Sequence, residues 1–283
     1  MINILRTREA VKSLVKNLHY SGKTIGFVPT MGALHKGHLE LVKKAKSSSD
    51  FVIVSIFVNP LQFNNLEDFQ KYPNTENADL KLLEEEGADA VFLPTSEEIY
   101  AKKPLLTIAF GGLDERLEGA FRPGHFSGVG IVVSKLLNIV NPDFLYLGQK
   151  DLQQVAVIRQ LVSELSFDVQ LIIVPTQREV DGLALSSRNL RLNCKERKAA
   201  TILFRVLTMA KNELLMGVSW FEIREKGLNM IASEPLARLE YLELVTTADI
   251  QPLVQLERHQ GVSVCIAVYI GEVRLIDNLS IIS

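Results

Sequence analysis

The spacing of hydrophobic and polar positions changes period along the first part of the chain. Between Thr7 and Gly22 apolar side chains recur every three or four positions, which predicts an amphipathic helix capped by Thr7 and ended by Gly22. Residues 24–28 and 51–57 are instead short β-branched and aromatic runs without alternation, which is typical of strands buried on both faces of a parallel sheet. Residues 37–46 between them return to the helical period, so the pattern predicts a βαβ unit.

The same alternation continues as far as residue 174. Helical and strand-like stretches follow one another in turn at residues 75–86, 90–93, 129–140, 144–147, 152–165 and 169–174. Regular alternation of this kind predicts an α/β fold, and we expect a doubly wound parallel-sheet (Rossmann-like) domain over residues 1–176.

A different pattern follows Pro175. A polar stretch to Asn193 precedes a long amphipathic helix around residues 199–210 and one further helix. Strand-like runs then lie at residues 239–245, 262–269 and 273–276. We therefore expect a smaller α+β domain over residues 177–283.

Composition limits the classes of function. The 283 residues include 31 Lys and Arg against 33 Asp and Glu, a net charge of -2, so no basic field indicates a nucleic-acid or membrane partner. No apolar stretch approaches the roughly 18 residues that span a bilayer, and the N-terminus lacks the order of a signal peptide. We expect a cytoplasmic protein that acts on small molecules.

Two glycine-containing segments resemble phosphate-binding motifs but do not complete them. Residues 21–24 look like the end of a P-loop, but Asn17 stands where the loop requires glycine. Residues 128–130 begin like a dinucleotide-binding fingerprint, but Val133 replaces its third glycine. Neither segment predicts nucleotide binding.

A stronger candidate is the segment of residues 29–38 (PTMGALHKGH), which lies between the first buried strand and the first crossover helix. Backbone N–H groups at the carboxyl end of a parallel strand, and at the start of the following helix, bind anions. Gly32 and Gly37 permit close approach of a ligand. His35 and His38, three positions apart, can direct both imidazoles at one phosphate. The alternative is a tight turn followed by two exposed histidines, and the position at a strand end favours phosphate binding.

Five segments, in the same order, resemble the pantoate-beta-alanine ligase family. Residues 29–38 also carry the His-x-Gly-His (HxGH) motif of the wider nucleotidylyltransferase superfamily. The other four segments are residues 57–63 (FVNPLQF), 117–126 (LEGAFRPGHF), 148–154 (GQKDLQQ) and 181–189 (DGLALSSRN). Five motifs in order are far more specific than HxGH alone.

The resemblance implies a reaction in which (R)-pantoate is joined to beta-alanine with ATP and Mg²⁺. A pantoyl adenylate forms on the enzyme, and pyrophosphate and then AMP are released. A carboxylate that attacks phosphorus needs no general base, so catalysis should depend on positioning and on offsetting negative charge. The resemblance also implies a homodimer. The alternatives are another HxGH nucleotidylyltransferase, which retains the nucleotide on its product, and a non-catalytic ATP-binding module.

Three residues are candidates for catalysis, namely His35, His38 and Lys150, and the resemblance places the catalytic histidine at His38. Lys150 follows a predicted strand, so its ammonium could reach a triphosphate at the carboxyl edge of the sheet; the alternative is a solvated surface lysine. By resemblance, ATP contacts Met31, Gly32, Ala33, Leu34, His35, Lys36, Gly37, His38, Gly148, Gln149, Lys150, Asp151, Gln177, Leu185, Ser186, Ser187 and Arg188.

The remaining candidates concern the leaving group, the metal and the second substrate. The hydroxyl and guanidinium donors of residues 186–188 suit pyrophosphate. Asp151 could hold Mg²⁺ or cap a helix. By resemblance Gln62 and Gln154 bind pantoate, for which an amide both donates and accepts hydrogen bonds, with Gln62 also near beta-alanine and Asn59 assigned to the substrate as well.

Two further points stay open in the sequence. Residues 122–125 (RPGH) either shape a loop at the site or pack between subunits. We also expect the C-terminal domain to close over the site, because an adenylate needs shielding from water.

Overall fold

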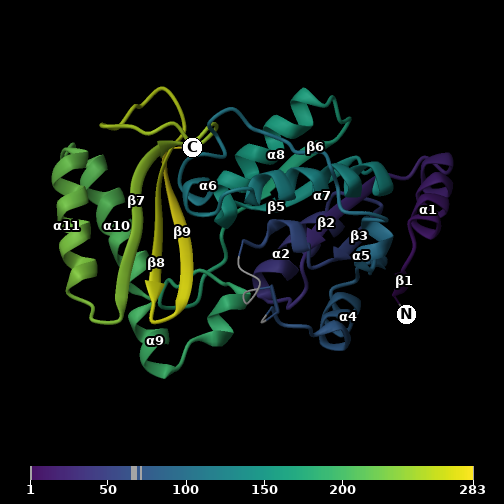
Figure 1. The fold of residues 1–283 in the computed structure, drawn as a ribbon, viewed down its shortest axis with the longest axis horizontal. Coiled ribbons are helices and arrows are strands. Elements are labelled where there is room, and N and C mark those ends of the chain that lie inside the picture. Colours follow the sequence, from purple (N-terminus) through teal and green to yellow (C-terminus); the bar gives the residue numbers. More distant parts are fainter. Residues whose placement is uncertain (1, 65–68, 71, 283) are drawn as a thin grey trace. The chain divides into compact units, whose positions relative to one another are not determined.

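The computed structural model describes residues 2–64, 69–70 and 72–282, shown as a ribbon in Figure 1. The chain divides into two compact units. Unit 1 consists of Met1–Gln149 and Val157–Pro175, and unit 2 of Lys150–Ala156 and Thr176–Ser283. Residues 150–156, which fall inside the first of the two domains expected from the sequence, thus group with unit 2.

Unit 1 contains a six-stranded sheet in the order β1-β4-β3-β2-β5-β6, in which every pairing is parallel. Its strands are β1 (Asn3–Leu5), β2 (Ile25–Thr30), β3 (Phe51–Ile56), β4 (Ala90–Phe92), β5 (Phe144–Gly148) and β6 (Gln170–Val174). The doubly wound α/β fold predicted from the sequence is confirmed. Only β1 was not predicted, because its three residues are too short to show a period.

The strand order reverses between β2 and β5. From β2 the chain proceeds outward on one side through β3 and β4, whereas β5 and β6 lie on the other side. In open α/β sheets ligands bind at such a switch point, beyond the carboxyl ends of the strands. Phe27 on β2 pairs with Leu145 on β5, and continuing this register brings Thr30 level with Gly148. The HxGH loop and residues 148–149 therefore leave the sheet side by side.

Helices connect the strands. They are α1 (Arg8–Tyr20), α2 (Lys36–Lys46), α4 (Glu76–Glu85), α5 (Ser96–Ile99), α6 (Glu118–Phe121), α7 (His125–Val140) and α8 (Leu152–Glu164), with the 3₁₀ turns η1 (Pro60–Gln62) and η2 (Gln149–Asp151). The bounds of α1, α2, α4 and α8 follow the predicted periods closely, whereas α7 begins four residues earlier than predicted and the short helices α5 and α6 were not predicted. Thr7 caps α1 as predicted, since its hydroxyl accepts a hydrogen bond from the N–H of Ala10 at 3.2 Å. Within the described part of the chain, none of the helices combines the length and apolar character that a membrane crossing requires.

Helix α2 is fixed by its packing on the sheet. It contacts β2, β3 and β5, and its apolar face, including Leu41 and Val42, joins a core with Val28, Val54 and Tyr146 from these strands. All five side chains are buried. Burial of an aliphatic side chain contributes about 1.5–3 kcal/mol, so this core holds the first turn of α2 firmly against the end of β2.

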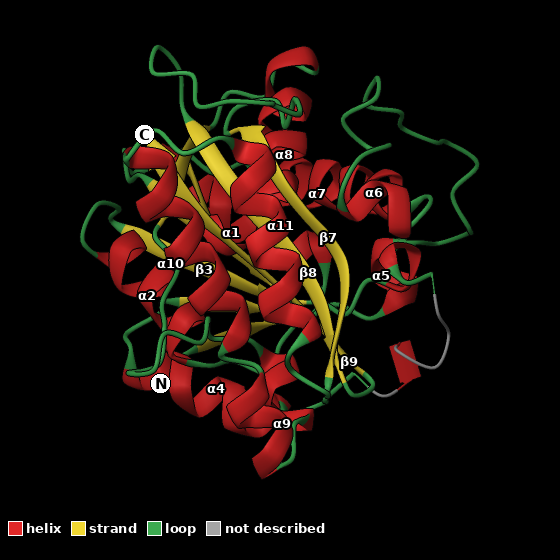
Figure 2. Ribbon diagram, turned by 90° about the vertical axis from the view of Figure 1, so that its left-hand side faces the viewer, coloured by secondary structure: helices red, strands yellow, loops and turns green. Residues whose placement is uncertain are grey.

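Unit 2 contains an antiparallel sheet of β7 (Ala237–Thr246), β8 (Val262–Ile270) and β9 (Val273–Ile282). Helices α10 (Ile202–Leu215) and α11 (Trp220–Ala232) pack against each other and against these strands, as Figure 2 shows. Helix α9 (Cys194–Ala199) and the 3₁₀ turn η3 (Ser187–Arg191) precede them. The predicted α+β character of this part is confirmed.

Two expectations for unit 2 need correction. The helix expected around residues 199–210 is interrupted, because at Thr201 the backbone N–H bonds to Lys198 three residues back, and α10 begins only after it. Strand β9 continues to Ile282 rather than ending at residue 276. Asp277 and Asn278 hide this continuation, since adjacent Asp and Asn are typical of turns.

Candidate active site

The loop that follows β2 is held by a buried carboxylate. Asp79, on α4, is 2% exposed and accepts hydrogen bonds from the N–H groups of Ala33 at 2.9 Å and Leu34 at 2.8 Å. Ala33 has a φ of 50° and Gly32 a φ of 79°, both in the left-handed region. Because that region is unfavourable for alanine, the two hydrogen bonds stabilise a loop shape that the chain alone disfavours.

The two histidines of the motif lie together at the start of α2. Their ring centroids are 4.0 Å apart. His35 Nδ1 accepts from the N–H of Gly37 at 3.1 Å, and His38 Nδ1 accepts from the N–H of His35 at 3.3 Å, which forms a capping box. A neutral imidazole whose Nδ1 accepts carries its proton on Nε2. Each ring therefore presents an Nε2–H donor, and the caps fix the orientation of both.

A chain of polar side chains lies beside this loop, after the carboxyl end of β3. Asn59 is 1% exposed and donates to Gln62 Oε1 at 3.1 Å and to the carbonyl of Gly128 at 3.1 Å. The Tyr100 hydroxyl donates to Asn59 Oδ1 at 2.8 Å. Burial raises the pKa of Tyr100 far above its ordinary value, so the hydroxyl keeps its proton. Gln62 Nε2 in turn lies 2.8 Å from Met31 Sδ, which links the predicted substrate residues to the HxGH loop.

The RPGH segment acts within the same part of unit 1. His125 Nδ1 lies 2.8 Å from the carbonyl oxygen of Gln62, and Arg122 donates to the same oxygen at 3.2 Å. Since a carbonyl only accepts, His125 Nδ1 must donate. A β-carbon on Gly128 would lie 2.3 Å from the carbonyl oxygen of Leu61. Residues 122–125 and Gly128 thus fix the backbone of η1, which supports the first of the two alternatives for this segment.

Lys150 and Asp151 form the start of unit 2. The side chain of Lys150 is only 17% exposed, and its Nζ lies 3.7 Å from Asp151 Oδ1. The carbonyl of Lys150 accepts a hydrogen bond at 2.7 Å from Asn278 Nδ2, on β9. Most of the Lys150 side chain is thus covered, unlike that of a fully solvated surface lysine. Gln154, the other predicted pantoate residue, is half-buried in the first turn of α8.

The second group of predicted ATP residues in unit 2 is brought together by a turn. The N–H of Leu185 donates to the carbonyl of Gln177 at 2.9 Å. Ser186 caps η3, since its hydroxyl accepts from the N–H of Arg188 at 3.3 Å. Ser187 between them is 9% exposed. The turn therefore brings residues 185–188 close to Gln177.

The residues that could hold a metal are few. Across the described ranges no cluster of three or more His, Cys, Asp or Glu side chains could hold a metal ion. Mg²⁺ that accompanies a nucleotide usually keeps several waters and takes one or two carboxylates together with phosphate oxygens. Asp151, whose side chain is 48% exposed, fits such a ligand set.

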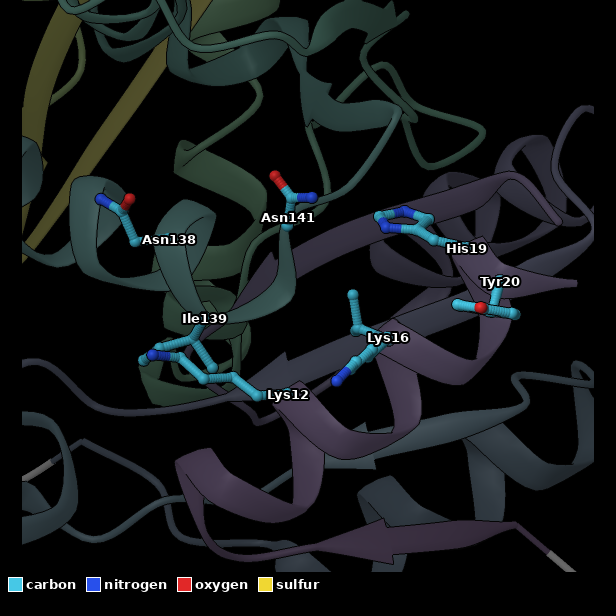
Figure 3. A pocket seen from close by; sticks show the side chains of 8 residues that line it. Lys12, Lys16, His19, Tyr20, Asn138, Ile139 and Asn141 are labelled. Atoms are coloured by element: carbon cyan, nitrogen blue, oxygen red, sulfur yellow. The ribbon is translucent and has the colours of Figure 1, made fainter. Parts of the chain in front are cut away.

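A cavity of about 500 Å³ lies elsewhere in unit 1, between α1 and α7 (Figure 3). It is lined by Lys12, Val15, Lys16, His19, Tyr20, Asn138, Ile139 and Asn141. None of the predicted site residues lines it. Several of the lining residues come from the last turns of the two helices, whose carbonyl groups carry partial negative charge.

Comparison with known proteins identifies the family. The family model of pantoate-beta-alanine ligase matches residues 3–280. The chain belongs to the pantoate-beta-alanine ligase family. Pantothenate synthetases of Thermoanaerobacter sp. (strain X514) and Cytophaga hutchinsonii are 50% identical over 270 residues and 48% identical over 260 residues, covering 95% and 92% of this chain and of the respective relative. The resemblance carried by the five segments is confirmed, and the chain is an enzyme of the ligase class.

Solved structures of this ligase family share the fold. The pantothenate synthetase of Thermus thermophilus is 40% identical, covers 100% of both chains and has a TM-score of 0.93. The pantoate-beta-alanine ligase of Francisella tularensis, complexed with beta-gamma ATP and beta-alanine, is 40% identical, covers 99% of this chain and 97% of that chain, and has a TM-score of 0.83.

Several residues around the ligase's candidate site were not found from the sequence. Asp79, Tyr100 and Asn278 form hydrogen bonds with predicted site residues. Arg178 and Asp277 are linked to the site through Asn278. Asp79 gave no signal, because acidic residues are common in the first turn of any helix. Asp277 and Asn278 gave no signal of buried partners either, because adjacent Asp and Asn are typical of a turn.

Proposed function

We propose that this ligase activates pantoate as an acyl adenylate before beta-alanine attacks. A carboxylate oxygen of pantoate bonds to the α-phosphorus of ATP while the bond to the bridging oxygen breaks, and pyrophosphate leaves. The amine nitrogen of beta-alanine then attacks the acyl carbon and loses a proton, while the bond to the AMP oxygen breaks. Membership of the family supports the overall ligation, and the ligands of the Francisella tularensis structure are consistent with ATP and beta-alanine as substrates.

The observation that carries the proposal is the orientation of the two imidazoles. His35 and His38 each accept a backbone hydrogen bond at Nδ1, so a neutral ring carries its proton on Nε2, and both rings lie at the N-terminus of α2. Negative charge grows on the phosphate oxygens during attack, and donors held in place before the reaction offset that charge without reorganisation. The partial positive charge of the helix N-terminus acts in the same direction.

The residues of unit 2 are proposed to bind the same nucleotide. Lys150 would offset charge on the triphosphate, and the donors of residues 186–188 would bind the leaving pyrophosphate. Asp151 would hold Mg²⁺, which neutralises charge on the leaving group. The ATP contacts inferred from the resemblance, from Met31 to His38, Gly148 to Asp151, Gln177, and Leu185 to Arg188, stay part of this proposal.

Pantoate would bind to Gln62, Asn59 and Gln154. An amide donates to a carboxylate and accepts from a hydroxyl, and pantoate carries both groups. The Gln62 side chain is held by Asn59 and lies against Met31 Sδ, so its amide has a fixed direction before the substrate arrives. Such preorganisation lowers the entropy that binding must otherwise lose.

The test separates the two half-reactions. With ATP, Mg²⁺ and pantoate but no beta-alanine, the enzyme should release about one pyrophosphate per active site, and AMP and pantothenate should appear together once beta-alanine is added. Pyrophosphate release that does not require pantoate would overturn the proposal. A product that keeps the nucleotide would indicate another HxGH nucleotidylyltransferase, and ATP binding without turnover a non-catalytic module. His38→Ala should slow this pyrophosphate release, and His19→Ala, which alters a histidine away from the HxGH loop, is its matched control.

The quaternary state stays a prediction from the resemblance, and the closure and the location stay predictions from the sequence. A homodimer should appear in light scattering at twice the 31.6 kDa chain mass. Closure of the C-terminal domain should reduce the radius of gyration when ATP and pantoate are both bound, as small-angle scattering would measure. A cytoplasmic location would be tested by fractionation of the native host.

A further inference from the structure

Three polar residues form a buried network in unit 2, which we call the β9 anchor: Arg178, Asp277 and Asn278. The guanidinium of Arg178 donates to both carboxylate oxygens of Asp277, at 2.5 and 2.9 Å. It also donates to the carbonyl of Asn278 at 3.0 Å, while the N–H of Asn278 donates to Asp277 Oδ1 at 2.8 Å. Asp277 and Asn278 are each 4% exposed. The three residues are therefore bonded to one another, and Asp277 and Asn278 are shielded from water.

The anchor reaches outward to two backbone carbonyls. Asn278 Nδ2 donates to the carbonyl of Lys150 at 2.7 Å, across 128 positions of sequence. Arg178 donates to the carbonyl of Gly182 at 3.1 Å, at the turn that leads into residues 185–188. Lys150 belongs to a segment proposed to bind ATP, and Gly182 lies shortly before another, residues 185–188.

The rest of unit 2 does not need this network for its core. The neighbouring positions of β8 and β9 are filled by apolar side chains such as Ile266 and Leu275, which pack without any desolvation of charge. Burial raises the pKa of the Asp277 carboxyl, whereas the charges of Arg178 and, less strongly, Lys150 act to lower it. An apolar pair at these positions would avoid that cost, so the anchor needs a reason other than packing.

We propose that Asn278, held by Arg178 and Asp277, is a positioning residue that fixes the backbone of Lys150 and so aims its ammonium at the nucleotide. In this role Asn278 acts through Lys150 and not on the substrate itself. The inference rests on the proposed role of Lys150 in adenylation. Displacing a reacting or stabilising group by about 1 Å costs on the order of 100-fold in rate, so a single backbone hydrogen bond is enough to matter.

The experiment compares two variants with a matched control. Asn278→Ala removes the donor, and Asn278→Leu removes it while keeping the volume of the side chain. Lys211→Met is the control, because Lys211 donates to the carbonyl of Ser280 on the same strand at 3.1 Å without touching Lys150. Two quantities are measured: pyrophosphate release with ATP and pantoate, and the rate at which acetic anhydride labels Lys150, read by peptide mass spectrometry.

The expected result is a shift in both quantities for the Asn278 variants alone. The rate of pyrophosphate release should fall about 10-fold to 100-fold with the KM for pantoate unchanged, and labelling of Lys150 should become several-fold faster as the side chain loses its fixed place. Wild-type labelling in both Asn278 variants overturns the inference, whatever happens to the rate. If the wild-type enzyme releases no pyrophosphate, the proposed function fails, and the labelling still decides whether Asn278 holds Lys150.

Discussion

The HxGH loop of unit 1 and the Lys150 segment of unit 2 are both held by a buried aspartate, but the two carboxylates are compensated differently. Asp79 accepts hydrogen bonds from neutral donors, namely two backbone N–H groups of the loop and the hydroxyl of Thr75 at 3.0 Å. Asp277 pairs with the guanidinium of Arg178 and acts on Lys150 through Asn278. Unit 1 thus fixes its loop directly, whereas unit 2 does so through an ion pair.

This difference predicts which region is more sensitive to the loss of one partner. A hydrogen bond to a charged group contributes about 1.5–3 kcal/mol. Breaking a buried ion pair costs about 3–5 kcal/mol, because the remaining charge is left without compensation in the interior. Removing one partner of Asp79 should therefore lower the free energy of unfolding by less than removing one partner of the ion pair in the β9 anchor.

The largest effect is expected for Arg178→Met. Asp277 would remain buried without its cation, so the free energy of unfolding should fall by about 3–5 kcal/mol in urea titrations near neutral pH. The pKa of Asp277 is already raised by burial, and loss of Arg178 removes the main cause that lowers it. When the pKa of a carboxyl is higher in the folded than in the unfolded protein, the free energy of unfolding falls as the pH rises from the unfolded pKa, about 4, through the folded pKa. The deficit should thus be smaller under acidic conditions.

The control for this prediction removes both charges. Arg178→Met combined with Asp277→Leu leaves no unpaired ion, so most of the lost stability should return. If Arg178→Met alone costs no more than the loss of one hydrogen bond to Asp79, the contrast between the two regions is wrong.

The second prediction separates the two functions of His38. His38→Asn keeps an acceptor near the Nδ1 position, so the cap on His35 N–H survives, but the Nε2–H donor is lost. We expect adenylation to slow by about 100-fold to 1,000-fold, equivalent to roughly 2.7–4 kcal/mol, with an unchanged unfolding midpoint. Single-turnover pyrophosphate release measures the rate.

The complementary variant is His38→Gln. Its amide can place a donor near the Nε2 position but removes the capping acceptor. This variant should retain more adenylation activity than His38→Asn and lose up to about 1 kcal/mol of stability, as the loss of a helix cap does. The reverse order of activities would show that His38 acts through the cap and not as a phosphate donor.

The third prediction concerns the loop itself. Asp79→Asn replaces one carboxylate oxygen by an NH₂ group that faces a backbone N–H of Ala33 or Leu34, so one of the two bonds is lost. Stability should fall by about 1–3 kcal/mol, and adenylation should slow because the left-handed turn at Ala33 loses support. Thr75→Val, which removes only a neutral donor to the same carboxylate, is the matched control and should cost less. Equal losses in both variants would contradict a direct role of Asp79 in the loop.

Much of this organisation could be predicted from the sequence, and the limit lies at long-range polar pairing. The strands, the helices and the place of the HxGH loop followed from periods of residues close in sequence and from the switch-point rule. The partners of Asp277 and Asn278 did not, because Arg178 and Lys150 lie 99 and 128 positions away. Local patterns cannot distinguish a polar pair buried in a strand from a turn, so β9 was predicted to end too early.

Asp79 illustrates the same limit in unit 1. Its position in the first turn of α4 is explained locally by the helix dipole, so no local pattern indicates a partner 45 or 46 positions earlier. The predicted site residues were those whose types carry chemistry, such as His38 and Lys150. The residues that hold them were hidden, because their role depends only on what the fold brings beside them.

The smallest effect is expected at an exposed ion pair of unit 2. Comparing this pair with the buried pair of Arg178 and Asp277 tests whether burial makes the β9 anchor sensitive to substitution. Asp181 and Arg197 are bonded at 2.8 Å, with side chains 47% and 32% exposed, and this bond and the N–H of Leu183 lower the pKa of Asp181. Exposed pairs contribute about 0.2–1 kcal/mol, so Asp181→Asn should cost no more than that.

The pH dependence of this effect differs from that of Arg178→Met. A carboxyl with a lowered folded pKa stabilises the folded protein above its unfolded pKa, about 4, and this contribution is lost as the pH falls through the folded pKa. The difference between wild type and Asp181→Asn in urea titrations should therefore begin to shrink below about pH 4 and vanish once the pH is below the folded pKa of Asp181, whereas the deficit of Arg178→Met changes above about pH 4. A cost at Asp181 as large as at Arg178 would show that charge pairing alone, and not burial, sets the response of unit 2.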